Sequence, residues 1–266
     1  MPQNLLDTIF NSDGEIDYER VQNAVDGVIS GIYQVRRLDA EGEGGRIKGS
    51  RLLIGASLII AGETRTSRES DPRKRRNKEE DLLEKYAKSQ KAWIDDIEAF
   101  KDLLAEFGKG AEAKAYEHPE VPVAVIKIAP IPYILDSDSS ILRFFDDKIA
   151  LHNTLPNVAP YELIGFARDW NVSRGETFLA VLRQPYIRGE ETIGLDERFL
   201  QQMQDDGFSI DHSRTKFSGK GLSVLDVTDK NVIRTEDGKF ITFDPMVFYI
   251  NDSDYRSLEL VDDAGR

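Results

Sequence analysis

The sequence predicts an α+β protein in which a helical N-terminal region precedes a small mixed sheet that carries one helix. Apolar residues recur at spacings of three and four through much of the first hundred residues, as they do in amphipathic helices. After Phe107, short β-branched and aromatic runs alternate with turn signals, which is typical of strands. The expected order there is strand, strand, helix, strand, strand.

Composition favours a folded globular protein. The 266 residues are enough for one large domain or two modest ones, and the 40% hydrophobic content can bury a core. The net charge of -13, from 48 acidic and 35 basic side chains, argues against broad binding to nucleic acid or to an anionic membrane. With no cysteine, neither disulfides nor thiolate chemistry is available.

The expected location is the cytoplasm, without a membrane segment. The N-terminus lacks the basic and apolar regions of a secretory signal. The longest apolar-rich run, LLIGASLIIAG from Leu52, covers only about half of the ~20 residues that span a bilayer. We therefore expect a buried helix there.

The first hundred residues predict three helices. One covers residues 17–37, the buried helix follows a glycine-rich break, and a long one covers residues 79–107, where Asp95 or Asp96 divides it as an N-cap. The polar segment at residues 62–81 has no periodicity and predicts an exposed connection. Its RKRR cluster is compatible with a phosphate or nucleic-acid contact, but acidic residues follow at once, so a solvated charged segment is the favoured interpretation.

The second half predicts the sheet and its flanking elements. A hairpin is expected over residues 107–130, a helix over residues 139–156 that Ser139 or Ser140 opens, and two strands in YELIGFARDW and ETFLAVLRQPYI. A helix ending at Gly207 and three short strands follow. The letters TEDG predict a hairpin turn between the last two strands.

Candidate residues for phosphoryl transfer from ATP occur along this half of the chain. The reaction needs a backbone cover for the phosphates, a cation on them, magnesium ligands and a base that faces the acceptor hydroxyl. The candidates are Gly108 and Gly110 for the cover at a hairpin tip, Lys127 for the cation, Asp146 for pairing with Lys127, Asp226 for the base, and Asn231 and Asp244 for magnesium.

At these residues the sequence resembles the protein-kinase-like superfamily. In that superfamily an Asn follows the catalytic-loop Asp at plus five, and a metal-binding Asp comes after a short hairpin. The resemblance extends over roughly residues 50 to 250 to the kinase-like domain of polyvalent proteins of phages and conjugative elements. The segments that carry it are RLLIGASLIIAG, LLEKYAKSQKAWIDD, GKGAEAKAY, IALHNTLP, YELIGF, RQPYI and DVTDKNVIRTEDGKFITFDPM.

The resemblance implies a compact bilobal kinase-like fold that binds ATP and magnesium between its lobes. It implies a helical region over residues 1–98, an N-lobe over residues 99–187 and a minimal C-lobe over residues 188–266. Backbone groups around Gln184 and Tyr186 would then lie near adenine. The acceptor would be a hydroxyl, with a Ser, Thr or Tyr of a protein substrate following from the resemblance alone.

Several features depart from an ordinary protein kinase. Val224 stands where a His is usual, Asp244 is followed by Pro and Met, and only 22 residues follow Asp244. The alternative function is therefore a catalytically weak pseudokinase that acts as a nucleotide-binding or protein-interaction module. A helical adaptor that binds no nucleotide is a third possibility.

Each candidate also has a simple structural explanation. Lys127 can be a solvated strand end, Asp226 and Asn231 can cap turns, and the two glycines can end a helix. Asp146 can be a solvated residue of its helix. His152 forms no metal spacing with the other histidines and is expected to be a satisfied structural residue.

Overall fold

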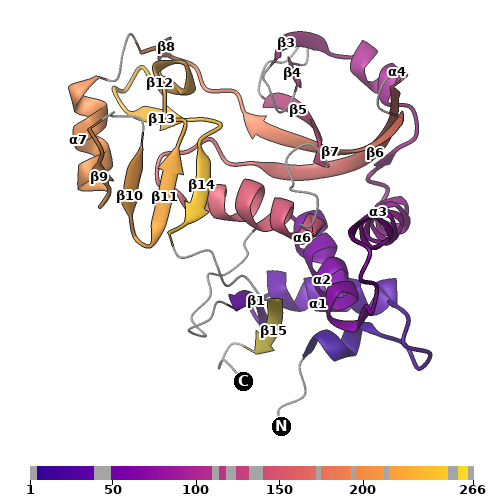
Figure 1. Ribbon diagram of the computed structural model, residues 1–266. Coiled ribbons are helices and arrows are strands. Elements are labelled where there is room, and N and C mark those ends of the chain that lie inside the picture. Colours follow the sequence, from indigo (N-terminus) through magenta and orange to yellow (C-terminus); the bar gives the residue numbers. More distant parts are fainter. Residues whose placement is uncertain are drawn as a thin grey trace.

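The computed structural model shows an α+β fold (Figure 1). It describes residues 5–38, 49–109, 114–117, 124–131, 140–171, 175–192, 196–212, 216–250 and 257–262. Helices α1 (Tyr18–Ile29), α2 (Arg51–Thr66) and α3 (Pro72–Ser89) lie below a six-stranded sheet in Figure 1, and most of the later short strands lie to the left of it.

The first helix is shorter than its apolar spacing predicts. α1 ends at Ile29, whereas a helix was expected over residues 17–37. Gly31 has φ +81°, and the chain then enters β1 (Tyr33–Leu38). β1 pairs antiparallel with β15 (Ser257–Asp262), so a contact with a distant segment decides the conformation there.

The polar segment at residues 62–81 is largely exposed, as expected, but it is mostly helical, so the expectation of an irregular connection is wrong. α2 continues to Thr66, and α3 starts at Pro72, with Asp71 as its N-cap. The charged composition conceals this helix because its buried stripe is narrow and includes two carboxylates. The buried residues of α3 are Glu79, Glu80, Leu83, Tyr86 and Ala87.

α3 ends at Ser89, so the long helix expected over residues 79–107 is interrupted. The short strand β2 (Trp93–Ile94) and helix α4 (Ile97–Asp102) follow. Asp96 caps α4, as predicted, and its side chain accepts a hydrogen bond from a backbone N–H at 2.9 Å.

The six-stranded sheet has the hydrogen-bonded order β2-β6-β7-β5-β4-β3. The strands after β2 are β3 (Ala105–Lys109), β4 (Lys114–Glu117), β5 (Ala124–Pro130), β6 (Glu162–Asn171) and β7 (Gly175–Pro185). Among the described residues β2 and β6 are parallel and the other pairs are antiparallel. β2 precedes residue 99, so the sheet uses residues on both sides of the boundary expected there.

One continuous helical segment connects β5 to β6, within the range predicted for a helix. It consists of α6 (Ile141–Arg143), the π-helix η2 (Phe144–Leu151) and the 3-10 turn η3 (His152–Thr154). Ser140 caps it, and the buried Glu79 of α3 accepts hydrogen bonds from the Ser140 hydroxyl (2.7 Å) and from the first backbone N–H (2.9 Å). α3 thereby fixes the start of this segment.

The chain after β7 forms short strands and one helix. These are β8 (Glu190–Glu191), α7 (Glu197–Asp205), β9 (Ser209–Ile210), β10 (Phe217–Gly219), β11 (Leu222–Leu225), the 3-10 turn η4 (Asp229–Asn231), β12 (Val232–Arg234), β13 (Phe240–Thr242) and β14 (Met246–Tyr249). Their sheets have the orders β14-β11-β10-β9 and β13-β12-β8. The predicted TEDG turn joins β12 to β13, where the N–H of Gly238 donates to the carbonyl of Thr235 (2.9 Å).

Three apolar clusters hold these elements together. The largest joins the 3-10 helix η1 (Leu5–Ile9), α1, α2 and α3 to η2, β6 and β7. A second cluster covers the other face of the sheet beside α4, and a third lies among α7 and the strands β10 to β14. None of the described helices has the length and apolar character needed to cross a bilayer.

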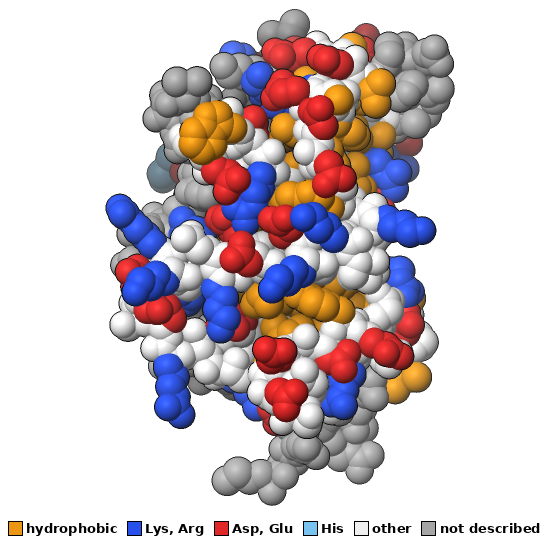
Figure 2. All heavy atoms as spheres, turned by 90° about the vertical axis from the view of Figure 1, so that its right-hand side faces the viewer, with side chains coloured by type: hydrophobic (Ala, Val, Ile, Leu, Met, Phe, Trp, Pro, Cys, Tyr) orange, Lys and Arg blue, Asp and Glu red, His pale blue; other side chains and the backbone are white. Residues whose placement is uncertain are grey.

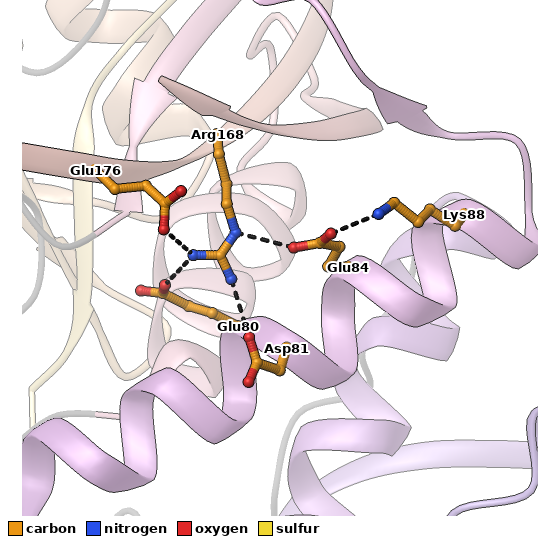
Figure 3. A network of polar contacts seen from close by, with 6 residues as sticks. All are labelled: Glu80, Asp81, Glu84, Lys88, Arg168 and Glu176. Carbon is orange, nitrogen blue, oxygen red and sulfur yellow. Dashed lines mark hydrogen bonds and ion pairs between the residues drawn. The ribbon is translucent and has the colours of Figure 1, made fainter. Parts of the chain in front are cut away.

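The surface on the right-hand side of Figure 1 carries interspersed acidic and basic side chains (Figure 2). One group joins α3 to the β6–β7 hairpin through Arg168 of β6 (Figure 3). Its guanidinium lies 2.9 Å from Glu84, 3.1 Å from Asp81 and 3.5 Å from Glu80, all on α3, and 2.7 Å from Glu176 on β7. Four carboxylates around one cation fix the helix against the sheet.

Candidate nucleotide and metal site

Two of the predicted aspartates lie at the same end of the β11–β14 pair. The register places Leu225 opposite Met246, so Asp226, which follows β11, and Asp244, which precedes β14, are neighbours across the sheet. Both have left-handed backbone conformations, with φ 56° and 58°. A non-glycine residue in this region costs free energy, and such residues concentrate at functional sites.

Asn231 connects the two aspartates. Its Nδ2 donates to the backbone oxygen of Asp226 at 2.9 Å and lies 3.4 Å from an Asp226 carboxylate oxygen. The backbone carbonyl of Asn231 accepts a hydrogen bond from the N–H of Phe243 (3.0 Å), the residue before Asp244. With the amide NH₂ group engaged by Asp226, the side-chain oxygen of Asn231 is the atom that remains to bind a cation.

Lys127 reaches this group from the six-stranded sheet. It lies on β5, between β4 and β7, and its side chain is buried. Its Nζ forms an ion pair with the Asp244 carboxylate and lies 5.5 Å from the centre of the Tyr161 ring. The structure therefore brings together Lys127, Asp226, Asn231 and Asp244.

Lys127 forms an ion pair with Asp244, and its pairing with Asp146 stays a prediction. Asp146 lies on η2 and is buried, with 3% of its surface exposed, so it is not the solvated residue of the alternative interpretation. η2 contacts β14, the strand that follows Asp244.

Of the two glycines predicted to cover the phosphates, the structure describes Gly108. Gly108 lies within β3, opposite Ala115 and beside a register shift, and so is not at the hairpin tip where it was predicted. Lys109 and Lys114 form the last pair of the hairpin. Gly110 lies outside the described residues.

The residues predicted to lie near adenine, Gln184 and Tyr186, lie at the end of β7. Gln184 on β7 is buried, and its Nε2 donates to the carbonyl of Ala159 (2.8 Å). Ala159 in turn donates its N–H to the carbonyl of Thr242 (2.9 Å), two residues before Asp244. Tyr186 is half-buried. With the Gln184 side chain engaged, backbone groups are what this segment offers to a ligand.

Tyr161 was not among the predicted site residues. Its hydroxyl donates to Oδ1 of Asp244, the carboxylate that also pairs with Lys127. In the sequence it stands in YELIGF, one of the segments that resemble the kinase-like family. Aromatic residues beside strands are too common to indicate such a contact.

His152 packs against Tyr161 and is only partly satisfied. The ring centres are 4.5 Å apart, and Nδ1 lies 3.2 Å from Oδ1 of Asn153, but the buried Nε2 has no hydrogen-bond partner among the described residues. Burial lowers the pKa of His152 to about 4, although hydrogen bonding to Asn153 opposes the shift. The imidazole is therefore neutral near pH 7.

The donor atoms fit a hard divalent cation. Magnesium prefers oxygen ligands and is usually held by one or two carboxylates together with water and phosphate oxygens. Asp244 and Asn231 supply such oxygens, and Lys127 supplies a cation beside them. The described residues contain no group of three or more His, Cys, Asp and Glu side chains arranged for a metal, so a site here depends on the amide oxygen.

Comparison with known proteins agrees with this arrangement. A family model described as a serine/threonine/tyrosine kinase found in polyvalent proteins matches residues 76–252, more than half of the chain. No curated protein matches. The matched range contains Lys127, Asp226, Asn231 and Asp244, and the chain belongs to this kinase family.

Proposed function

We propose that this protein transfers the γ-phosphoryl group of ATP, with magnesium, to a hydroxyl acceptor. One observation carries the proposal. Lys127 from β5, Asp226 after β11, Asn231 at the end of η4 and Asp244 before β14 are connected by contacts, although they come from separate segments. This group contains a phosphate-binding cation, magnesium ligands and a base, which are the parts the reaction requires.

In this proposal the molecule has two lobes with the nucleotide between them. The six-stranded sheet is the main part of the N-lobe, and the strands from β8 to β14 form a minimal C-lobe. Gly108 and Gly110 help to cover the phosphates, and backbone groups near Gln184 and Tyr186 face adenine. The helices of the N-terminal region, α1, α2 and α3, pack against the N-lobe.

The chemistry assigns one task to each residue. Lys127 orients the phosphates, and Asn231 and Asp244 hold magnesium, which when bound would offset the charge of the phosphate oxygens. Asp226 accepts the hydrogen bond of the acceptor hydroxyl and directs its oxygen at the γ-phosphorus. The new O–P bond forms as the bond to the β-phosphate oxygen breaks, ADP leaves, and the hydroxyl proton passes to Asp226 and then to solvent.

Calorimetric titration of ATP, with and without magnesium, tests the binding part. We expect magnesium-dependent binding to the wild type, loss of that binding in Asp244→Ala, and retention of it in Asp226→Ala. Asp205→Ala, which removes an exposed carboxylate from α7, is the matched control and should bind like the wild type. No binding to the wild type under either condition would contradict the proposal.

A second candidate, a nucleotide-binding or interaction module without transfer, has one observation in its favour. Both carboxylate oxygens of Asp244 are already engaged, one by Lys127 and one by Tyr161. Labelled ATP distinguishes the two functions. Label on protein acceptors with the wild type and none with Asp226→Ala supports transfer to Ser, Thr or Tyr, whereas magnesium-dependent binding with no transfer to any hydroxyl offered supports the module.

The family description places relatives of this chain in polyvalent proteins. We propose that the chain acts in the cytoplasm of a bacterium that a phage or conjugative element enters. ATP is then its small-molecule partner and a protein its acceptor, with no membrane or direct nucleic-acid contact.

A further inference from the structure

Tyr161 contacts the site without being one of its expected residues. It lies directly before β6, is buried, with 3% of its surface exposed, and donates its hydroxyl to Oδ1 of Asp244. Oδ2 of the same carboxylate faces Lys127. The two contacts fix the carboxylate plane, because rotation about the last side-chain bond would break both.

Asn153 holds the backbone of Tyr161 on both sides. Its Nδ2 donates to the Tyr161 carbonyl at 2.7 Å, and its Oδ1 accepts the Tyr161 N–H at 2.7 Å. This double contact uses both the oxygen and the nitrogen of the side-chain amide and joins η3 to the residue before β6. The neighbouring His152 packs its ring on the Tyr161 ring at 4.5 Å.

From these contacts we propose that Asn153 and Tyr161 form a positioning pair, in which Asn153 fixes the tyrosine and the tyrosine hydroxyl orients Asp244 for magnesium. The inference rests on the proposed function, because it assigns the purpose of the oriented carboxylate. Neither residue touches the reacting atoms. Groups that orient a metal-binding residue in this way commonly change metal affinity about 10- to 100-fold when removed.

The test uses the full chain and Tyr161→Phe, which keeps the ring against His152 and removes only the hydroxyl. ATP affinity is measured by calorimetry over a series of magnesium concentrations. We expect the half-saturating magnesium concentration to rise about tenfold, with unchanged binding of ATP in the absence of metal. Asn153→Ala should shift it in the same direction, and Asn153→Asp, which keeps the acceptor oxygen, should shift it less.

Tyr18→Phe is the matched control, because it removes a tyrosine hydroxyl that donates to the carbonyl of Leu82 (3.4 Å), at the distant α1–α3 contact. It should leave the magnesium dependence unchanged. A Tyr161→Phe variant that matches the wild type would overturn the proposal. A lower half-saturating magnesium concentration in Tyr161→Phe would also overturn it, since the hydroxyl would then compete with the metal for Asp244.

A double-mutant cycle separates failure of this inference from failure of the proposed function. Tyr161→Phe and Asp244→Ala are combined, and the urea midpoint of each variant is measured without nucleotide. If the wild type binds no magnesium-ATP, the proposed function fails. The cycle then tests only whether Tyr161 and Asp244 interact. Non-additive midpoint shifts support orientation of Asp244 by Tyr161, and additive shifts overturn it.

Discussion

Asp226 and Asp244 show, at the scale of single residues, that this site is built on backbone conformations that ordinary side chains resist. Both lie in the left-handed region, where a β-carbon approaches a carbonyl oxygen. The hydrogen bonds from Asn231 and Phe243 hold the surrounding loop in place. The two aspartates therefore lower the stability of the fold at the positions where the proposed chemistry needs them.

Replacement of Asp226 tests this cost. Asp226→Gly removes the β-carbon and should be more stable than Asp226→Ala by about 1 kcal/mol, because glycine adopts the left-handed region freely. Urea denaturation of both variants measures the difference. Equal stability of the two would show that the conformation at residue 226 carries no such cost. Both variants should lose phosphoryl transfer.

At the scale of elements, α2 and α3 approach closely because Gly55 has no side chain. A β-carbon added there would lie 1.9 Å from the Tyr86 hydroxyl oxygen and 2.4 Å from the adjacent ring carbon. Tyr86 is fully buried, and burial raises the pKa of its hydroxyl to about 12. The ring has no room to move aside.

Gly55→Ala should therefore destabilise the protein by about 1–3 kcal/mol, as overpacking of a core usually does. Thr64→Ala, at an exposed position of the same helix, is the control, because this change trims a surface side chain and adds no atom to the core. Thermal unfolding of the two variants gives the comparison, and equal losses would contradict the account of the α2–α3 contact.

The acidic group around Arg168 makes the α3–sheet contact dependent on pH. Burial raises the pKa of Glu80 to about 7, although Arg168 and Arg76 oppose the shift. The folded state then binds this proton more tightly than the unfolded state does. Its contribution to stability is fully present below about pH 4.5 and is lost as pH rises to about 7.

Glu80→Gln should remove that part of the pH dependence. Its thermal midpoint should fall less than that of the wild type between pH 5 and 8, with both proteins measured in the same buffers. Glu84→Gln provides the contrast. Burial acts to raise the pKa of Glu84, but hydrogen bonds from Lys88 and Arg168 outweigh it and lower the pKa. The thermal midpoint of Glu84→Gln should therefore lie furthest below that of the wild type at neutral pH. A Glu80→Gln profile parallel to the wild type would contradict the prediction.

The elements differ in how far the sequence predicts them. Local signals predicted the Asp96 cap, the TEDG turn, the buried α2 helix and the order of strands around η2. They missed β1, which depends on β15, and α3, whose buried stripe contains carboxylates. The resemblance to the kinase-like superfamily implied that Lys127, Asp226, Asn231 and Asp244 act as one group, and the structure brings these four residues together.

The Tyr161 contact could not be predicted in this way. Tyr161 and Asp244 are 83 positions apart, and no spacing rule relates the residue before one strand to the residue before another. The hydrogen bonds of Asn153 with the Tyr161 backbone are similarly specific to the folded chain. Contacts of this kind need coordinates.

At the scale of the whole molecule, the N-terminal helices share one core with the sheet. Leu6, Ile9 and Val21 belong to the same buried cluster as Phe166 and Phe178. The family match begins at residue 76, so it omits η1, α1 and α2, which supply much of that cluster. The kinase-like part of the chain depends on these helices for its packing.

A truncated protein of residues 76–252 should therefore fail to fold cooperatively, because the apolar surface that α1 and α2 cover would be exposed. Circular dichroism and size-exclusion chromatography, with the full chain measured alongside, provide the comparison. A monomer with a sharp thermal transition near that of the full chain would contradict the prediction.

The hydrogen bonds that run from Gln184 through Ala159 to Thr242 have a consequence for motion. They join the end of β7 to the strand that precedes Asp244 by two successive links, 2.8 and 2.9 Å long. A connection so short leaves little freedom for hinge rotation between the two halves of the molecule. If the protein binds a nucleotide as proposed, nucleotide exchange should then proceed by small rearrangements of side chains, while the backbone around Ala159 and Thr242 keeps a fixed separation.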